Sequence, residues 1–149
     1  MVRSWAPVWL ALATFACSPV LDWREVHLEG LQAMLPCKPD HGERNVQLGT
    51  LEVRLQMSGC EAGGVLYAIS HVRVQGGDQA TAVQAAWRSV ALANMRASAV
   101  QPHPIRLGKP PASGSSALEL LSAQGTQPDG KPVQARLVWI VAGNDVYHV

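Results

Sequence analysis

Hydrophobic and polar residues alternate most clearly in the segment 51–57. The apolar residues of this segment fall on one face, and they are Leu51, Val53, Leu55 and Met57. Because successive side chains of a strand point to opposite faces, this period of two predicts a half-buried strand. Residues 65–74 are rich in β-branched residues and are expected to pair with it as a hairpin, across the separating sequence SGCEAGG.

The pattern changes to a helical period between Asp78 and Ala97. Apolar residues here recur at helical spacing on one stripe, formed by Val83, Trp87, Val90, Ala91 and Met95. Asp78 follows two glycines and is expected to cap the first turn by accepting hydrogen bonds from free N–H groups. The stripe predicts an amphipathic helix whose large side chains fill the core.

Shorter apolar runs complete the expected sheet. A run that begins at Leu31 is closed by Pro36 and Pro39, so a strand is expected to end near Pro36. Further strands are expected at 103–108 and, three in number, within 117–149, with turns at 128–130 and 143–145. The order predicts an α+β fold, an antiparallel β-sheet of about five to six strands with one main amphipathic helix.

The last expected strand, Val146–Val149, is only four residues long. Its partner, 137–141, suggests a pairing of about five residues or more. A pairing this short would leave backbone groups of the partner strand unpaired, which folded domains normally avoid. We therefore expect the natural protein to continue this strand beyond Val149.

The first 16 residues resemble a secretory leader. Arg3 stands near the start, an apolar run extends from Trp5 to Phe15, and small residues follow. The run is shorter than the roughly 20 apolar residues that a membrane-spanning helix needs. We expect a signal segment at 1–16, an N-terminal arm at 17–30 and a single α/β domain at 31–149.

Cys17 follows the leader directly and resembles the lipobox cysteine of bacterial lipoproteins. In that family the thiol of the cysteine is acylated, and after cleavage the cysteine is the first residue of the protein. The family favours Leu three residues before the cysteine, whereas this chain has Thr14 there, so ordinary cleavage after Ala16 and an uncleaved anchor remain alternatives. By the same resemblance, Ser18 favours the outer membrane.

The chain has three cysteines, which is an odd number. If Cys17 carries lipid, Cys37 and Cys60 are left as one pair, and an oxidising compartment favours a disulfide between them. The alternative is that both are small buried hydrophobic residues. Metal binding is not favoured, because no CxxC or HxxxH spacing accompanies them.

The chain also resembles a group of bacterial secreted proteins and lipoproteins similar to the PsbP-like fold. The residues that carry this resemblance are LPCKPD at 35–40, SGCEAGG at 58–64, the single helix, and the closing segment 125–149. The resemblance implies an antiparallel sheet flanked by helices. It also implies a binding or assembly subunit rather than an enzyme.

Charge and motif content exclude several kinds of function. The chain has twelve Lys and Arg and eleven Asp and Glu, and loss of Arg3 with the leader leaves the mature domain neutral. Nucleic-acid binding needs a basic face, which this composition does not supply. The five histidines have no paired spacing, and the serines of 113–116 are not in a nucleophile elbow. We predict no catalytic residues, no metal ligands and no cofactor; His71 is the histidine of greatest interest.

Two functional hypotheses follow. The preferred one is a non-catalytic, lipid-anchored interaction or assembly module on the periplasmic face of the envelope, whose partners are the membrane, through Cys17, and an unidentified envelope protein. The alternative is a small periplasmic hydrolase or ligand-binding protein with a loop-built site. A soluble periplasmic or secreted location is the alternative to the outer membrane.

Overall fold

The computed structural model describes residues 20–105 and 116–149 as nine strands and one helix. A two-stranded hairpin consists of β1 (Arg24–Leu28) and β2 (Leu31–Leu35). The main sheet has seven antiparallel strands in the order β3-β4-β5-β9-β8-β7-β6. Their bounds are β3 Asp40–Leu48, β4 Leu51–Ala62, β5 Val65–Arg73, β6 Ala99–His103, β7 Ser116–Thr126, β8 Pro132–Ala142 and β9 Asp145–His148. The helix α1 spans Gly77–Asn94.

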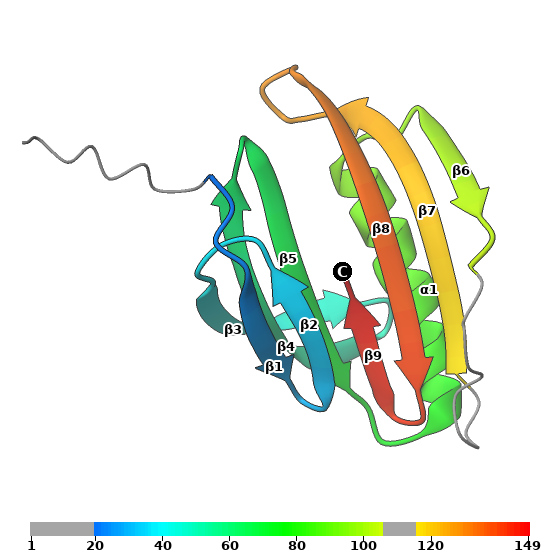
Figure 1. Cartoon of the computed structure of the whole chain (residues 1–149). Coiled ribbons are helices and arrows are strands. Elements are labelled where there is room, and N and C mark those ends of the chain that lie inside the picture. The colour runs from blue at the N-terminus through cyan, green and yellow to red at the C-terminus, as the bar shows by residue number, and fades with distance from the viewer. Residues whose placement is uncertain (1–19, 106–115) are drawn as a thin grey trace, which may run out of the picture.

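These elements form three layers (Figure 1). The helix α1 covers one face of the main sheet, and the β1–β2 hairpin lies on the opposite face, against β4 and β5. Within the described residues, no element lies in front of β7 and β8 on the hairpin side. The hairpin therefore covers only part of one face, and the helix leaves Met57 and Leu66 exposed on the other.

The prediction of one sheet of about five to six strands in a PsbP-like α/β sandwich is wrong. The described part of the protein is mostly β, with 59% of the described residues in strands, arranged as a seven-stranded sheet plus a two-stranded sheet. The polar segment Asp40–Leu48 forms the edge strand β3, in which only Val46 and Leu48 are not exposed. From Asp40 to Asn45 both faces of the strand are exposed to water and carry no hydrophobic alternation, so the sequence pattern did not reveal it.

Strands were predicted more accurately where one face is buried. β2 ends at Leu35, directly before Pro36, and the three C-terminal strands are confirmed. The hairpin of β4 and β5 is also confirmed, but its turn is only Gly63 and Gly64, which have φ angles of 59° and 75°. The rest of the expected separator, Ser58–Ala62, belongs to β4.

Packing of apolar side chains against the sheet stabilises the helix α1. Val83 and Trp87 are buried in a core that also contains Val72, Val141 and Val146 from three strands. The predicted cap by Asp78 is wrong, because Gly76 is the N-cap residue, without a side-chain hydrogen bond, and Asp78 lies in the first turn. Among the described residues, no helix has the length and apolar content required to cross a membrane.

A second, smaller core lies beneath the hairpin. Val26 and Leu35 of the hairpin pack on Cys60 and Ile69 of the main sheet. The segment expected as an arm therefore supplies β1, and β1 pairs with β2 along its whole length. This small core holds the hairpin over β4 and β5.

Candidate functional site

A row of polar side chains crosses the hairpin-facing side of the sheet, from β3 to β9. Nε2 of Gln56 donates a hydrogen bond of 3.4 Å to Oε2 of Glu43. The side-chain oxygen Oε1 of Gln56 lies 3.2 Å from Nδ1 of His71. Nε2 of His71 lies 2.8 Å from Oδ1 of Asp145, and Arg73 donates to both oxygens of the same carboxylate. We call these five residues the polar row.

The polar row keeps Asp145 ionised. Burial alone would raise the pKa of Asp145, but the hydrogen bonds from Arg73 and His71, together with their charges, lower it below the usual value of 3.8. The His71 side chain is only 4% exposed, whereas that of Arg73 is 62% exposed. The row therefore connects a buried imidazole to a solvent-exposed guanidinium through one carboxylate.

The geometry does not favour His71 as a general base. Both of its ring nitrogens are engaged by other side chains, Nδ1 with Oε1 of Gln56 and Nε2 with Oδ1 of Asp145. A general base needs a free lone pair within reach of a substrate proton. Its ring also packs against the Tyr147 ring, with centroids 5.0 Å apart. The role that these contacts support is to fix β5 to β4 and β9.

Two pockets border the hairpin, with volumes of about 350 Å³ and 360 Å³. His41 lines both of them, and its Nδ1 lies 2.6 Å from Oγ of Ser58. A Ser–His pair is the core of many nucleophilic sites, but a nucleophile must reach its substrate. Ser58 is completely buried, so this pair is arranged as a structural hydrogen bond.

An aromatic stack lies on the helix side of the sheet. His148 stacks on Trp139, with ring centroids 4.6 Å apart, and also contacts Trp87 of α1. Burial lowers the pKa of His148 from 6.5 to about 4, so its ring is neutral at physiological pH. Trp139 Nε1 and His148 Nε2 are buried and have no hydrogen-bond partner among the described residues.

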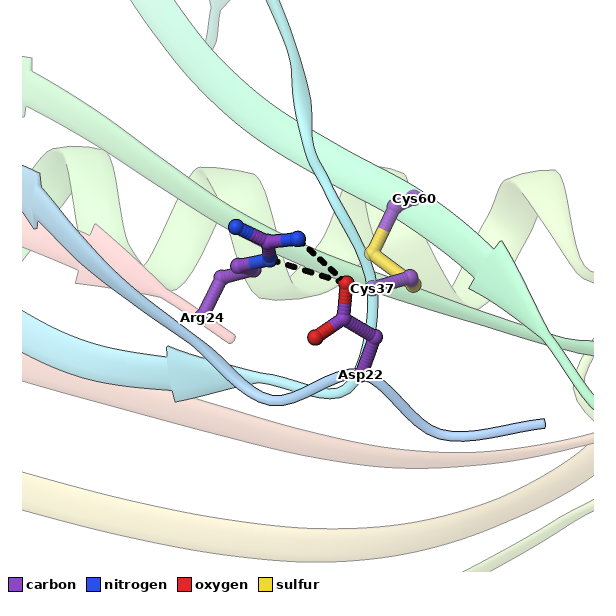
Figure 2. Close-up of a disulfide and its surroundings, with 4 residues drawn as sticks. All are labelled: Asp22, Arg24, Cys37 and Cys60. Carbon is purple, nitrogen blue, oxygen red and sulfur yellow. Dashed lines mark hydrogen bonds and ion pairs between the residues drawn. A yellow bond between two sulfur atoms is a disulfide. The ribbon is translucent and has the colours of Figure 1, made fainter. Parts of the chain in front are cut away.

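The predicted disulfide between Cys37 and Cys60 is confirmed, with an S–S distance of 1.99 Å and a Cα–Cα distance of 5.9 Å. Figure 2 shows this bond beside the ion pair of Asp22 and Arg24, where the chain enters the hairpin. Cys37 lies two positions after the end of β2, and Cys60 lies in β4. The bond therefore fastens the hairpin covalently to the main sheet.

Cys17, the predicted lipidation site, and Ser113 and Ser115 lie outside the described residues. Within residues 20–105 and 116–149, no three His, Cys, Asp or Glu side chains are placed to hold a metal ion. Sequence reasoning singled out His71 but not its partner Asp145, which is 74 positions away. Only the order of the strands brings β5 and β9 together, and no local pattern encodes that order.

Comparison of the chain with protein-family models, with curated proteins and with solved structures finds no match, so the resemblance to the PsbP-like group stays a prediction.

Proposed function

We propose that the protein is a non-catalytic interaction or assembly module on the periplasmic face of the bacterial envelope, anchored in the outer membrane by lipid at Cys17. The observation that carries this proposal is the uncovered half of the sheet. On the hairpin side of β7 and β8, four partly exposed apolar side chains lie together by register: Leu118, Leu120, Val138 and Ile140. Such an apolar face on a strand scaffold is typical of a surface that binds another protein.

Exposed apolar residues close to Cys17 support the lipid anchor. Val20, Leu21 and Trp23 are 73%, 44% and 56% exposed. They follow Cys17 within six positions, so a lipid on that cysteine would bring them to the membrane surface. Trp favours the interface between lipid and water, because its ring is apolar and its N–H is polar.

Ligand binding is the second candidate, because the two pockets beside His41 are large enough for a small molecule. They are lined by residues of the strands and of the segment that connects β2 to β3. The polar groups around them already bond one another, as His41 does with Ser58 and Glu43 with Arg54. This pairing leaves fewer polar groups to orient a substrate, and it favours the interaction module.

The anchor is tested by the intact mass of protein extracted from membranes. We expect a chain that begins at Cys17 and carries added acyl mass, and a Cys17→Ala variant without that mass that is released from the membrane. A chain that begins at Met1, or at Cys17 without acyl mass, would contradict the anchor.

The interaction is tested by a photo-crosslinking side chain placed at Leu120, on the uncovered face. The matched control position is Ser89, which is exposed on α1. We expect one discrete crosslinked protein from Leu120 in intact cells and none from Ser89. Equal labelling from both positions, or none from either, would count against an interaction surface here.

A further inference from the structure

One of the two pockets beside the hairpin is lined mainly by polar and charged residues. It has a volume of about 360 Å³ and lies between β1 and the segment that connects β2 to β3. Its walls are residues 24–27 of β1, Lys38 and Pro39 of the connecting segment, and His41 of β3. We call this space the hairpin pocket. None of its lining residues belongs to β7 or β8, so it is separate from the uncovered face of the sheet.

Lys38 is the charged residue of the hairpin pocket that lacks a partner. The guanidinium of Arg24 donates to the carboxylate of Asp22 (Figure 2). The carboxylate of Glu25 lies 2.7 Å from Nε2 of His27. Lys38 is exposed, and its ammonium has no hydrogen bond or ion pair within the described part of the chain. The charged group that is left to bind a ligand is therefore a cation.

The main chain of Lys38 is held from both sides. Cys37 is joined to Cys60 of β4 by the disulfide, and Pro36 before it is completely buried. Pro39 follows Lys38, and its ring restricts Lys38 to extended conformations. The ammonium therefore projects from a fixed backbone, which reduces the ordering that binding of a ligand requires.

The hydrogen bond between His41 and Ser58 leaves a second donor at the hairpin pocket. Oγ of Ser58 lies 2.6 Å from Nδ1 of His41, and Ser58 is completely buried. Its hydroxyl has no other hydrogen-bond partner among the described residues, so its proton is donated to Nδ1. The imidazole then carries its own proton on Nε2. His41 borders both pockets, and its Nε2–H is a donor without a described partner.

We propose that the hairpin pocket binds a small anionic ligand through a carboxylate or phosphate group, with Lys38 and Nε2–H of His41 as the donors. Both of these free groups donate, so the ligand must supply acceptor oxygens. Hydrogen bonds between a charged donor and an oxyanion are stronger than neutral ones. The volume of the hairpin pocket limits the ligand to a small molecule. This inference goes beyond the interaction function and does not rest on it.

Amide chemical shifts in a titration of the purified protein test the proposal. The probes are inorganic phosphate and succinate, each added at constant pH, with the ionic strength held constant by sodium chloride. We expect saturable shifts at Lys38 and His41, with half-saturation at about 1 mM or below for at least one probe. Saturation by phosphate alone assigns a phosphate group, and saturation by succinate alone assigns a carboxylate. Absence of saturable shifts with both probes would overturn the proposal.

Two variants with the same change of charge separate the hairpin pocket from a general attraction of anions. Lys38→Gln removes the ammonium of the pocket, and we expect it to weaken binding at least about tenfold. Lys131→Gln removes one positive charge between β7 and β8, where Lys131 pairs with Asp129. We expect binding in this control to change less than about twofold, because salt screens a distant charge. Equal weakening in both variants would overturn the proposal.

The contribution of His41 is tested separately. His41→Phe retains a flat ring but lacks the Nε2 donor, and we expect it to weaken binding about tenfold. Ser58→Ala retains the donor but removes the hydroxyl that fixes the ring, so a smaller loss of about threefold is expected. Unchanged affinity in His41→Phe would overturn the assignment of Nε2–H as a donor to the ligand. If His41→Phe fails to fold, the comparison of Lys38→Gln with Lys131→Gln still decides whether the pocket binds the anion.

Discussion

The hydroxyl of Tyr147 donates a hydrogen bond of 2.6 Å to the main-chain carbonyl oxygen of Glu29, across 118 positions of the chain. Tyr147 belongs to β9, in the centre of the main sheet, and Glu29 lies in the turn between β1 and β2. Glu29 has a positive φ of 46°, which is unfavourable for a residue with a side chain. This bond therefore supports a strained turn and fixes the free end of the hairpin to the sheet.

We predict that Tyr147→Phe loosens the hairpin without disrupting the main sheet. Loss of one buried hydrogen bond is expected to cost about 1 kcal/mol of the free energy of unfolding. Hydrogen exchange should show faster exchange in residues 24–35 and little change in β7 and β8. The control is Tyr67→Phe, since the Tyr67 hydroxyl has no hydrogen-bond partner among the described residues. An equal loss of stability in both variants would contradict the role of the bond.

The disulfide holds the other end of the hairpin. The two cysteines are 23 positions apart, and chain-entropy arguments assign about 3 kcal/mol to a closed loop of this size. We therefore expect Cys37→Ala/Cys60→Ala to lower the free energy of unfolding by about this amount in denaturant titrations. Wild-type protein under reducing conditions should lose a similar amount. A reduced protein as stable as the oxidised one would show that the small core alone holds the hairpin.

The close contact between β7 and the end of α1 depends on a glycine. A Cβ atom added at Gly125 would lie 2.0 Å from the carbonyl oxygen of Met95, which accepts a hydrogen bond from Thr126. Because main-chain atoms cannot move aside easily, we expect Gly125→Ala to destabilise the protein by about 1–3 kcal/mol. Gly42→Ala is the matched control, since a Cβ there meets nothing within 4 Å. Similar midpoints of thermal unfolding for both variants would refute the contact.

Sequence patterns revealed the elements that have one buried face and missed those that do not. The alternation at 51–57 and the stripe through Val83 and Trp87 predicted β4 and α1 because each of these elements places apolar side chains against the core. The edge strand β3 is exposed on both faces from Asp40 to Asn45, and β1 was interpreted as an arm because its alternation is imperfect. Local periodicity reports burial, so elements with little burial gave no signal.

The same limit applies to the candidate site. The pair Cys37–Cys60 followed from counting cysteines, which requires no knowledge of topology. The contact of His71 with Asp145 depends on β9 inserting between β5 and β8, although β8 and β9 are neighbours in the sequence and β5 is not. Strand order is a long-range property of the sheet, and no spacing of residues in the chain encodes it.

The stability of the protein is expected to depend on pH through His148. Burial against Trp139 and Trp87 lowers its pKa from 6.5 to about 4. Below pH 6.5 the unfolded chain binds a proton at this residue that the folded protein does not bind until about pH 4. Because the unfolded state binds more protons, stability decreases as the pH falls through this window, by about 3 kcal/mol in total.

A variant that cannot be protonated at position 148 separates this effect from other titrations. We expect His148→Phe, which retains an aromatic ring, to remove most of the pH dependence of the unfolding midpoint between pH 6.5 and 4. His27→Gln is the control, because the His27 side chain is 71% exposed. Below pH 4 both variants should still lose stability through Asp145. The pKa of this carboxyl lies below 3.8, so its ion pair with Arg73 is lost only as the pH falls through that lowered value. An unchanged slope between pH 6.5 and 4 in His148→Phe would show that the buried ring is not the group that titrates.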